Sequence, residues 1–376
     1  MHAISCCEVR TAPLACPAAI IEVMASLKEL LKLLAEDGAA LTREQAAGVL
    51  DQILSGDAPE VETAALLAVL ATRGEQAPEL AGFVETMRAR ATPVPLSSEE
   101  REELVDVVGT GGGGPATFNI STGAALVAAA AGASVAKHGN RAITSRCGSA
   151  DVLEALGVPI DLGPELAADC LRETGFMFLL APNYHPALKA VGPLRRALGF
   201  RTIFNLCGPL TNPAGARAQV IGVLAPSKAL LVARALAELG ARRAFVVHGT
   251  DGLDELTTTG ESVVARVEEP EEGGTPTLRA ARVTPEMAGL PRTTLDQLTG
   301  GDAQVNAAIL YDIVTGITGP RREIVLLNAA AALVAAGLAV DLKEGVAQAA
   351  KAIDSGEAAA TLAKLRAFGE KYGTAQ

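Results

Sequence analysis

Three short stretches of the 376-residue chain carry residue types that suit binding of a phosphorylated substrate. In the first, residues 106–122, Gly109 and the glycines at 111–114 follow an apolar run at 104–108 that is typical of a short buried strand. Glycines lack a Cβ, so the backbone N–H groups of such a loop can approach an anion closely. The Ala-rich stretch that follows predicts a helix, whose N-terminus adds free donors and partial positive charge. A flexible surface turn is the alternative, since the loop matches neither a Walker A motif nor a GxGxxG fingerprint.

The second stretch, residues 137–141, places a lysine, a histidine, an asparagine and an arginine after a predicted strand. Lysine is a compact charge and arginine a planar fork, so together they suit a polyanion, although a solvated turn has the same composition. Thr144, Ser145 and Ser149 add hydroxyls, and Gly148 makes a second tight turn before a predicted helix. The sequence therefore predicts a second helix N-terminus available to phosphate.

The third stretch is the acidic loop at residues 251–255, which follows another predicted strand and contains the adjacent carboxylates Asp254 and Glu255. Adjacent carboxylates can share Mg²⁺ ions that keep water ligands and bridge phosphate oxygens. A solvated acidic loop is an equally good interpretation of this stretch alone. Two glycine turns, a Lys/Arg loop and a carboxylate pair together describe a site for a magnesium-bound substrate with two separate phosphate groups, which is what a user of phosphoribosyl pyrophosphate requires.

The elements that must position these residues alternate between strand and helix from residue 104 onward, which predicts an α/β domain with a largely parallel central sheet. Sites on such sheets gather at the carboxyl ends of the strands, where these residues fall. An Ala-rich helical tail over residues 302–368 is expected to cover the sheet, and residues 268–275 to form a surface hairpin or loop. The predicted strands are 104–108, 134–137, 176–181, 220–224, 244–247 and 262–267, and the predicted helices 121–131, 149–156, 186–198 and 227–239.

A small all-helical unit precedes this domain. Leucines at 27, 30, 31 and 34 share one helical face, and Thr42 with Gln45 predicts a capping box that opens a second helix. Pro59 and Pro78 each stand at the start of a further helical run. Four short helices bury little by themselves, so a partner surface is expected, either the next domain or a second subunit. The expected domains are a disordered tail at 1–25, a small helical domain at 26–95 and a large α/β domain at 96–376.

Composition excludes several classes of partner. The net charge of −11 argues against nucleic acid and anionic membranes, and no uninterrupted apolar run is long enough to span a bilayer. The six cysteines show neither zinc-ligand spacing nor a disulfide framework, which favours a reduced, cytoplasmic protein.

Several long motifs resemble the anthranilate phosphoribosyltransferase family in the same order over residues 26–370. They are GTGGGGPATFNIST, KHGNRAITSRCGSADVLEALG, APNYHPALKAVGPLRRALGFRTIFNLCGPLTNPAG, VVHGTDGLDELT and GGDAQVNAAIL. The resemblance implies a helical domain plus an α/β domain, as in pyrimidine nucleoside phosphorylases. It also implies a homodimer formed through the small domain, which segments near 190–210 join. The implied reaction joins anthranilate to phosphoribosyl pyrophosphate in tryptophan biosynthesis, with pyrophosphate as the second product.

The resemblance also implies a set of site residues. For phosphoribosyl pyrophosphate they are Gly109, Gly112, Gly113, Thr117, Asn119, Ile120, Ser121, Thr122, Lys137, His138, Gly139, Asn140, Arg141, Ala142, Ile143, Thr144, Ser145 and Ser149. Gly109, Asn140 and Arg195 correspond to the anthranilate site, and Ser121, Asp254 and Glu255 to the ligands of two Mg²⁺ ions per subunit. No protein group is expected to act as a catalytic acid or base. Gly113 departs from the family, which usually has Asp there, whereas Thr144-Ser145 keeps both hydroxyls of its usual Ser-Ser pair.

Two other functions stay open at this point. A pyrimidine nucleoside phosphorylase of the same fold would use phosphate and a nucleoside, but the pair Asp254-Glu255 and the motif around Arg195 speak against it. A non-catalytic relative that binds nucleic acid should have lost these carboxylates and gained basic surface, whereas this chain keeps them and is acidic.

Overall fold

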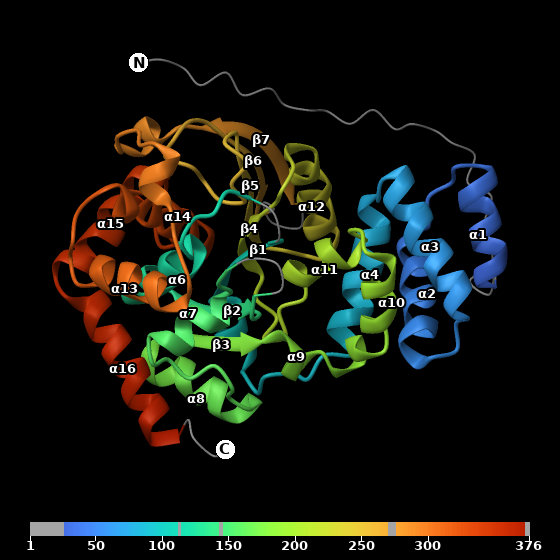
Figure 1. Ribbon diagram of the computed structural model, residues 1–376, viewed down its shortest axis with the longest axis horizontal. Helices are drawn as coiled ribbons and strands as arrows, with labels where there is room; N and C mark the ends of the chain where they lie inside the picture. The colour runs from blue at the N-terminus through green and yellow to red at the C-terminus, as the bar shows by residue number, and fades with distance from the viewer. Residues whose placement is uncertain (1–25, 112–113, 143–145, 270–275, 373–376) are drawn as a thin grey trace.

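The structure is a computed structural model that describes residues 26–111, 114–142, 146–269 and 276–372. The expectations for the tail at 1–25 and for Gly112, Gly113, Ile143, Thr144 and Ser145 lie outside these residues, as does most of the loop expected at 268–275. Figure 1 shows a large lobe built around a sheet and a smaller lobe of helices beside it. Within the described chain, no helix is both long and apolar enough to cross a membrane.

The sheet has seven strands in the described residues, in the order β3-β2-β1-β4-β5-β6-β7. The first five are mutually parallel, and β6 and β7 extend the sheet as antiparallel strands. The expectation of a largely parallel sheet is therefore confirmed. The strands are β1 (Leu104–Gly109), β2 (Ser134–Gly139), β3 (Phe176–Leu180), β4 (Ala218–Gly222), β5 (Arg243–Gly249), β6 (Ser262–Glu268) and β7 (Thr277–Val283).

The helices that precede the sheet are α1 (Leu27–Glu36), α2 (Arg43–Ser55), α3 (Glu60–Arg73), α4 (Ala77–Ala89) and α5 (Ser98–Glu102). Those between the strands are α6 (Ile120–Ala130), α7 (Ser149–Ala155), α8 (Pro164–Thr174), α9 (Ala181–Tyr184), α10 (Gly192–Leu198), α11 (Phe204–Leu210) and α12 (Pro226–Glu238). The C-terminal helices are α13 (Ala303–Val314), α14 (Pro320–Ala336), α15 (Leu342–Asp354) and α16 (Glu357–Tyr372). Short 3₁₀ helices lie at Pro186–Lys189, Pro285–Ala288 and Leu295–Leu298.

The two faces of the sheet belong to two different hydrophobic cores. Side chains alternate along a strand, so Val220 of β4 points to one core and Ile221 to the other, as do Phe245 and Val246 of β5. The first core lies under α6, α8 and the C-terminal helices, which cover the sheet on the left of Figure 1, as the Ala-rich tail predicts. The second core contains side chains from the opposite face of the sheet, from α12 and from the helical lobe. The two lobes therefore share one apolar core around α12, with no solvated layer between them at that point.

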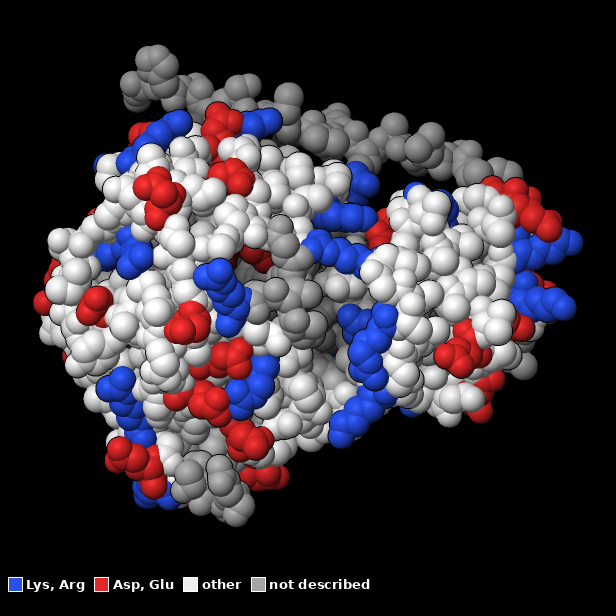
Figure 2. Space-filling view, in the orientation of Figure 1, with Lys and Arg blue, Asp and Glu red and all other residues white. Residues whose placement is uncertain are grey.

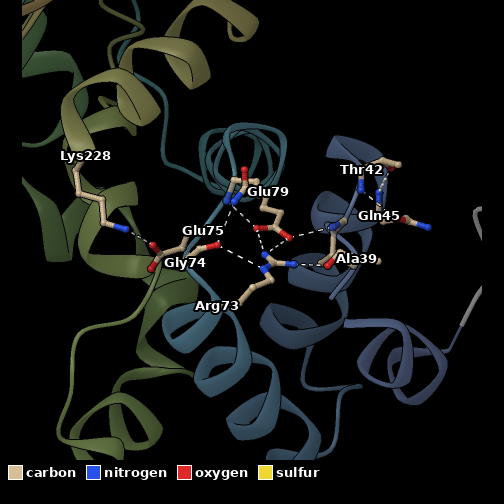
Figure 3. Close-up of polar contacts among 10 residues, drawn as sticks. Ala39, Thr42, Gln45, Arg73, Gly74, Glu75, Glu79 and Lys228 are labelled. Atoms are coloured by element: carbon tan, nitrogen blue, oxygen red, sulfur yellow. Dashed lines mark hydrogen bonds and ion pairs between the residues drawn. The ribbon is translucent and has the colours of Figure 1, made fainter. Parts of the chain in front are cut away.

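A buried ion pair organises the helical lobe (Figure 3). Glu79 of α4 is fully buried, and its carboxylate accepts hydrogen bonds from the Arg73 guanidinium and from the backbone N–H groups of Leu41 and Gln76, the latter two at 2.9 and 2.8 Å. Arg73 also donates to the carbonyl of Ala39. Arg73 ends α3, Glu79 belongs to α4, and Ala39 and Leu41 lie in the connection before α2. The ion pair therefore links α3 and α4 to that connection.

Polar contacts hold the helical lobe to both ends of α12. At its first turn, Lys228 Nζ lies 2.6 Å from a carboxylate oxygen of Glu75, in the connection between α3 and α4 (Figure 3). At its last turn, Arg43 of α2 donates to the carbonyl of Glu238 at 2.7 Å. The helix α12 therefore belongs by sequence to the α/β lobe and by contact to both lobes.

The structure corrects several predicted elements. The single helix expected over 186–198 is a 3₁₀ turn followed by α10, because Pro193 has no N–H to continue a helical ladder through this point. The strand expected at 220–224 begins and ends two residues earlier, and β2 continues to Gly139 rather than ending at 137. The helix α8 and the strand β7 were not predicted, whereas α11 lies within the helices near 190–210 that the resemblance implied. The capping box at Thr42 and Gln45 is confirmed, and Pro59 and Pro78 occupy the N-cap of α3 and the second position of α4.

Candidate functional site

The glycine loop lies at the carboxyl ends of β1 and β4, where the strand order reverses and α/β sheets bind ligands. Gly109 ends β1, and the N–H of Thr110 donates to the carbonyl of Gly222 at the end of β4 at 2.9 Å. Asp254 lies against the last residues of both β1 and β4. A Cβ at Gly109 would lie 2.5 Å from its Oδ2, and one at Gly222 would lie 1.5 Å from its carbonyl oxygen. Both positions therefore need glycine so that a carboxylate can sit against the glycine loop.

The carboxylate pair is held firmly in this position. Asp254 Oδ2 accepts a hydrogen bond from the N–H of Gly111 at 3.1 Å. Burial, followed by the charge of Asp254, raises the pKa of Glu255 well above its ordinary value. Leu253 and Leu256 on either side are buried, whereas Asp254 and Glu255 are half-buried. The acidic pair therefore lies on a loop that is anchored in the core and still reaches the surface of the site.

Lys137 lies inside β2 and not in a loop after it, which corrects the expected strand end. Its side chain is 2% exposed, and Nζ donates to the carbonyl of Val107 in β1 at 2.5 Å. Burial lowers the pKa of Lys137 to about 8, and the charges of Asp106 and then Glu255 oppose that shift. Lys137 therefore places a buried positive charge beneath the glycine loop, next to the acidic pair.

A polar cluster of Asp106, Lys137 and Asn212 separates β1 from β2 near their carboxyl ends. The two strands share a register of only two residue pairs, whereas β1 and β4 share five. In place of the missing ladder, the fully buried Asp106 accepts from the N–H of His138 at 3.2 Å and from Asn212 Nδ2 at 2.8 Å. Burial raises the pKa of Asp106 to about 6, with Asn212 and Lys137 opposing. This cluster sets where the glycine loop and the residues after β2 leave the sheet.

The start of α6 is fixed by a second buried contact. Asn119 donates to the carbonyl of Cys147 at 3.2 Å and accepts from Asn306 Nδ2 of α13 at 2.9 Å. Thr117 forms an isolated bridge with Thr299, so the arm that leads from the glycine loop to α6 pairs with the chain before α13. Of the other residues assigned here, Ile120 and Thr122 are fully buried and Ser121 is half-buried in the first turn of α6.

The residues after β2 form a compact turn. Ser149 Oγ donates to the carbonyl of Asn140 and accepts from its N–H, both at 3.2 Å, and a Cβ at Gly139 would lie 2.3 Å from that oxygen. Arg141 is exposed and forms ion pairs with Glu154 and Asp151 at 2.8 and 3.2 Å.

The second predicted phosphate turn satisfies its own donors. The N–H groups of Ala142 and Gly148 both donate to Asp151 Oδ2, at 2.9 and 2.8 Å. The start of α7 is therefore not an open anion site in this conformation, and a phosphate here would have to replace Asp151.

Arg195 stands apart from the other residues. It lies on α10, and its guanidinium packs over the ring of Phe204 at 5.3 Å, while Phe204 packs edge-on against Phe83 of α4. Burial lowers the pKa of Arg195 from its ordinary value. Figure 2 shows a groove between the two lobes with Lys and Arg side chains over α10 on its helical wall. Arg195 therefore belongs to the wall of the helical lobe, and the glycine loop to the α/β lobe.

The structure brings in residues that the sequence did not single out. Asp106, Asn212, Asn306 and Asn328 are all buried and all hold site loops. Two of them lie in motifs quoted above, Asn212 in GPLTNPAG and Asn306 in GGDAQVNAAIL. These two asparagines had no role assigned within their motifs, and that was the signal in the sequence that could have pointed to them.

The donor set fits a hard divalent cation. Among the residues that the structure describes, no group of three or more His, Cys, Asp or Glu side chains could hold a metal ion by itself. Two adjacent carboxylates are the kind of sparse oxygen set with which Mg²⁺ is bound, its remaining ligands being water and substrate phosphate. The pKa of Glu255 is raised first by burial and then by the charge of Asp254, and a cation at this point would oppose both effects.

Comparison with known proteins identifies the class first. Residues 101–359 match the model of the glycosyl transferase family a/b domain, and residues 28–91 match its helical bundle domain. A relative from Rhodopseudomonas palustris, an anthranilate phosphoribosyltransferase, is 49% identical over 328 residues, 87% of this chain and 94% of its own. One from Moorella thermoacetica with the same name is 49% identical over 336 residues, 89% of this chain and 96% of its own.

Solved structures agree with these relatives. Anthranilate phosphoribosyltransferase from Thermus thermophilus superposes with a TM-score of 0.80 at 44% identity, covering 90% of this chain and 98% of that one. The Saccharomyces cerevisiae enzyme in complex with PRPP and Mg gives 0.78 at 27% identity, covering 92% and 98%. The chain belongs to the anthranilate phosphoribosyltransferase family. The resemblance inferred from the motifs and the expected fold are both confirmed.

Proposed function

We propose that this chain transfers the phosphoribosyl group of 5-phosphoribosyl 1-pyrophosphate to anthranilate, releasing pyrophosphate. The observation that carries the proposal is the contact of Asp254 with Gly109, Gly111 and Gly222, which puts a carboxylate pair and a phosphate-binding loop at one point of the sheet. A nucleoside phosphorylase needs no such acidic pair. Its leaving group is a nucleobase and its nucleophile is phosphate, so it has no pyrophosphate leaving group for a metal to stabilise. The names of the relatives at 49% identity support the transferase and not this alternative.

Ser121, Asp254 and Glu255 would hold magnesium, as two ions per subunit. Bound there, the metal supplies positive charge to the departing pyrophosphate. The complex of the yeast relative with PRPP and Mg supports magnesium as the metal. Lys137 adds a fixed positive charge from inside the sheet, and the backbone donors of the glycine loop add more.

The remaining residues position the reactants. The described members of the set assigned to phosphoribosyl pyrophosphate lie in or after β1 and β2, although Asp151 occupies the turn before α7. Gly109, Asn140 and Arg195 would receive anthranilate across the groove. Arg195 would bind the anthranilate carboxylate through a charge-assisted hydrogen bond. The aniline nitrogen then attacks the ribose carbon, where positive charge develops in the transition state. Positioning and electrostatics account for the rate without a protein acid or base.

The wider setting belongs to the same proposal. The enzyme would act in tryptophan biosynthesis in the cytoplasm, without nucleic-acid or membrane partners. It would form a homodimer through the small helical domain, taken as residues 26–95 together with the helices near 190–210. Sedimentation velocity tests the dimer, and a monomer at micromolar concentration would contradict it.

Loss of anthranilate fluorescence tests the reaction. We expect it to require the protein, phosphoribosyl pyrophosphate and Mg²⁺ together, and to stop when a chelator removes the metal. Two further arms cover the other functions: phosphorolysis of a pyrimidine nucleoside, and binding of single-stranded DNA. Activity in either arm without anthranilate consumption would overturn the proposal.

A further inference from the structure

Two buried asparagines on the C-terminal helices hold the two halves of the site from behind. Asn306 lies on α13 and Asn328 on α14, and each is 2% exposed. Neither helix contributes a residue to the assigned site. Each asparagine nevertheless contacts one site loop, and the two loops are different.

Asn306 holds the arm that follows the glycine loop. Its Nδ2 donates to Asn119 Oδ1 at 2.9 Å, and its Oδ1 accepts from the N–H of Gly301 at 2.7 Å. Gly300 lets these groups meet, because a Cβ there would lie 2.5 Å from the backbone nitrogen of Phe118 and 2.7 Å from Asn306 Oδ1. Since Asn119 also donates to the carbonyl of Cys147, its amide is oriented at both ends.

Asn328 holds the acidic loop by its backbone. Its Oδ1 accepts from the N–H of Leu256 at 3.0 Å, and its Nδ2 donates to the carbonyl of the same residue at 2.9 Å. Leu256 directly follows Glu255 and is fully buried, so this contact fixes the peptide next to the carboxylate pair. A second bond from Nδ2 to the carbonyl of Ile324 orients the Asn328 amide within α14.

We infer that Asn306 and Asn328 are positioning residues with separate duties, Asn306 for phosphoribosyl pyrophosphate and Asn328 for the metal. The inference rests on the proposed function. An amide both donates and accepts, so neither residue can be replaced by an aliphatic side chain without leaving buried backbone or amide groups unpaired. Loss of Asn306 frees Asn119 and the start of α6, whereas loss of Asn328 frees the peptide beside Glu255. Neither asparagine contacts the reacting atoms in this assignment.

The variants Asn306→Ala and Asn328→Ala serve as each other's control, because both remove a buried amide from a C-terminal helix. Binding is measured directly, with phosphoribosyl pyrophosphate by calorimetry at saturating Mg²⁺, and with Mn²⁺ plus pyrophosphate by electron paramagnetic resonance. One hydrogen-bonded contact corresponds to about a tenfold change. We expect Asn306→Ala to weaken phosphoribosyl pyrophosphate about tenfold and Mn²⁺ less than about twofold, and Asn328→Ala to do the reverse.

Steady-state kinetics provides the second readout. KM for phosphoribosyl pyrophosphate should rise mainly in Asn306→Ala. The free Mg²⁺ concentration that gives half-maximal rate should rise mainly in Asn328→Ala. KM for anthranilate should rise in neither variant. If an alanine variant does not fold, Asn306→Ser and Asn328→Ser replace it, because a hydroxyl keeps a polar group at each buried position without adding a charge. Equal changes of both affinities in both variants, or none, would overturn the inference. A wild-type protein that does not consume anthranilate would instead overturn the proposed function.

Discussion

The two lobes are packed by different means. The core of the helical lobe consists mainly of leucines, whose long side chains fill the space between the helices. The buried leucines are Leu27, Leu30, Leu34, Leu41, Leu50, Leu54, Leu66, Leu67, Leu70 and Leu80. Around α6 and α14 the large lobe is instead closed mainly by alanines and glycines. They include Ala124, Ala125, Ala128, Ala329, Ala330, Ala331 and Ala332, with Gly123 against Leu310 and Gly345 against Ala330.

This difference teaches where the chain has no room for change. In the helical lobe one glycine, Gly82, is a point of close approach between helices, where a Cβ would lie 2.2 Å from the Arg43 carbonyl. The large lobe has more such close approaches, and those at Gly109, Gly139, Gly222 and Gly300 lie at the site. At these positions a side chain or backbone lies closer than a Cβ would allow, and the following changes test that contrast.

The largest effect is expected from the carboxylate pair. Asp254→Asn combined with Glu255→Gln keeps the shape of both side chains and removes their charge. Metal-bound charge stabilisation is worth several kcal/mol, so turnover should fall by more than about a hundredfold at ordinary Mg²⁺. Stopped assays of anthranilate consumption measure the rate, and circular dichroism controls for folding. A double variant with near-normal activity would show that the acidic pair does not bind the metal.

Gly222→Ala and Gly48→Ala compare the lobes directly. The first puts a Cβ 1.5 Å from the Asp254 carbonyl, so the backbone must move, and we expect a loss of about 3 kcal/mol in unfolding free energy together with activity. Gly48 is exposed in the middle of α2 with no atom within 4 Å of its Cβ position, so alanine should stabilise by about 0.5–1 kcal/mol. Urea denaturation of the two variants decides; equal effects would remove the contrast between the lobes.

Arg195→Ala tests the wall of the groove that the helical lobe supplies. A charge-assisted hydrogen bond is worth about 1.5–3 kcal/mol, so KM for anthranilate should rise about ten- to 150-fold. The effect on KM for phosphoribosyl pyrophosphate should be much smaller. Initial rates with each substrate varied in turn provide the measurement. Equal losses for both substrates would mean that Arg195 supports α10 on Phe204 and does not bind anthranilate.

The buried pair His138 and His185, whose rings lie 5.1 Å apart, should make stability depend on pH. Burial lowers the pKa of His138 to about 3 and that of His185 to about 4. Below the unfolded value near 6.5 only the unfolded chain binds these protons, so unfolding free energy falls as pH falls toward 4. Each ring contributes up to about 1.4 kcal/mol per pH unit. Urea denaturation at about pH 7 and pH 5 should show the wild type losing about 2–4 kcal/mol more than His138→Gln/His185→Gln; parallel losses would contradict this.

The smallest effect is expected at the ion pair between the lobes. The pair Lys228–Glu75 is partly exposed at the lysine end, so a double-mutant cycle with Lys228→Met and Glu75→Gln should give a coupling of about 0.5–1 kcal/mol. The shared apolar core beneath α12 should dominate the attachment instead. A coupling of several kcal/mol would mean that charge, and not this core, joins the lobes.

The sequence predicted what depends on local pattern. Periodicity and capping residues located the first four helices, and strand alternation with glycine punctuation located the parallel strands and the class of fold. The helix α8 carries buried Ala167, Ala168 and Leu171 on one face and could have been found in the same way.

Contacts between distant segments could not be predicted from pattern. The sequence predicted that Lys137 is a cation in a loop. Only the structure shows that Asp106 and Asn212 separate β1 from β2 beside it. The duties of Asn306 and Asn328 depend on partners 187 and 72 positions away. The acidic loop was expected to be solvated because its own residues are polar, whereas the position of Asp254 depends on the absence of a Cβ at Gly109 and Gly222.

The pairing of β1 with β4 has a consequence for how the chain assembles. Val105 lies opposite Ala218, and the arm after the glycine loop is held by Asn306. Long-range pairings of this kind form slowly, because a long loop must close before any contact repays its entropy. During synthesis, β1 and its glycine loop leave the ribosome well before α13 exists to hold them. The arm that leads to α6 is thus made early in synthesis, and its contact with Asn306 can form only after α13 has been made.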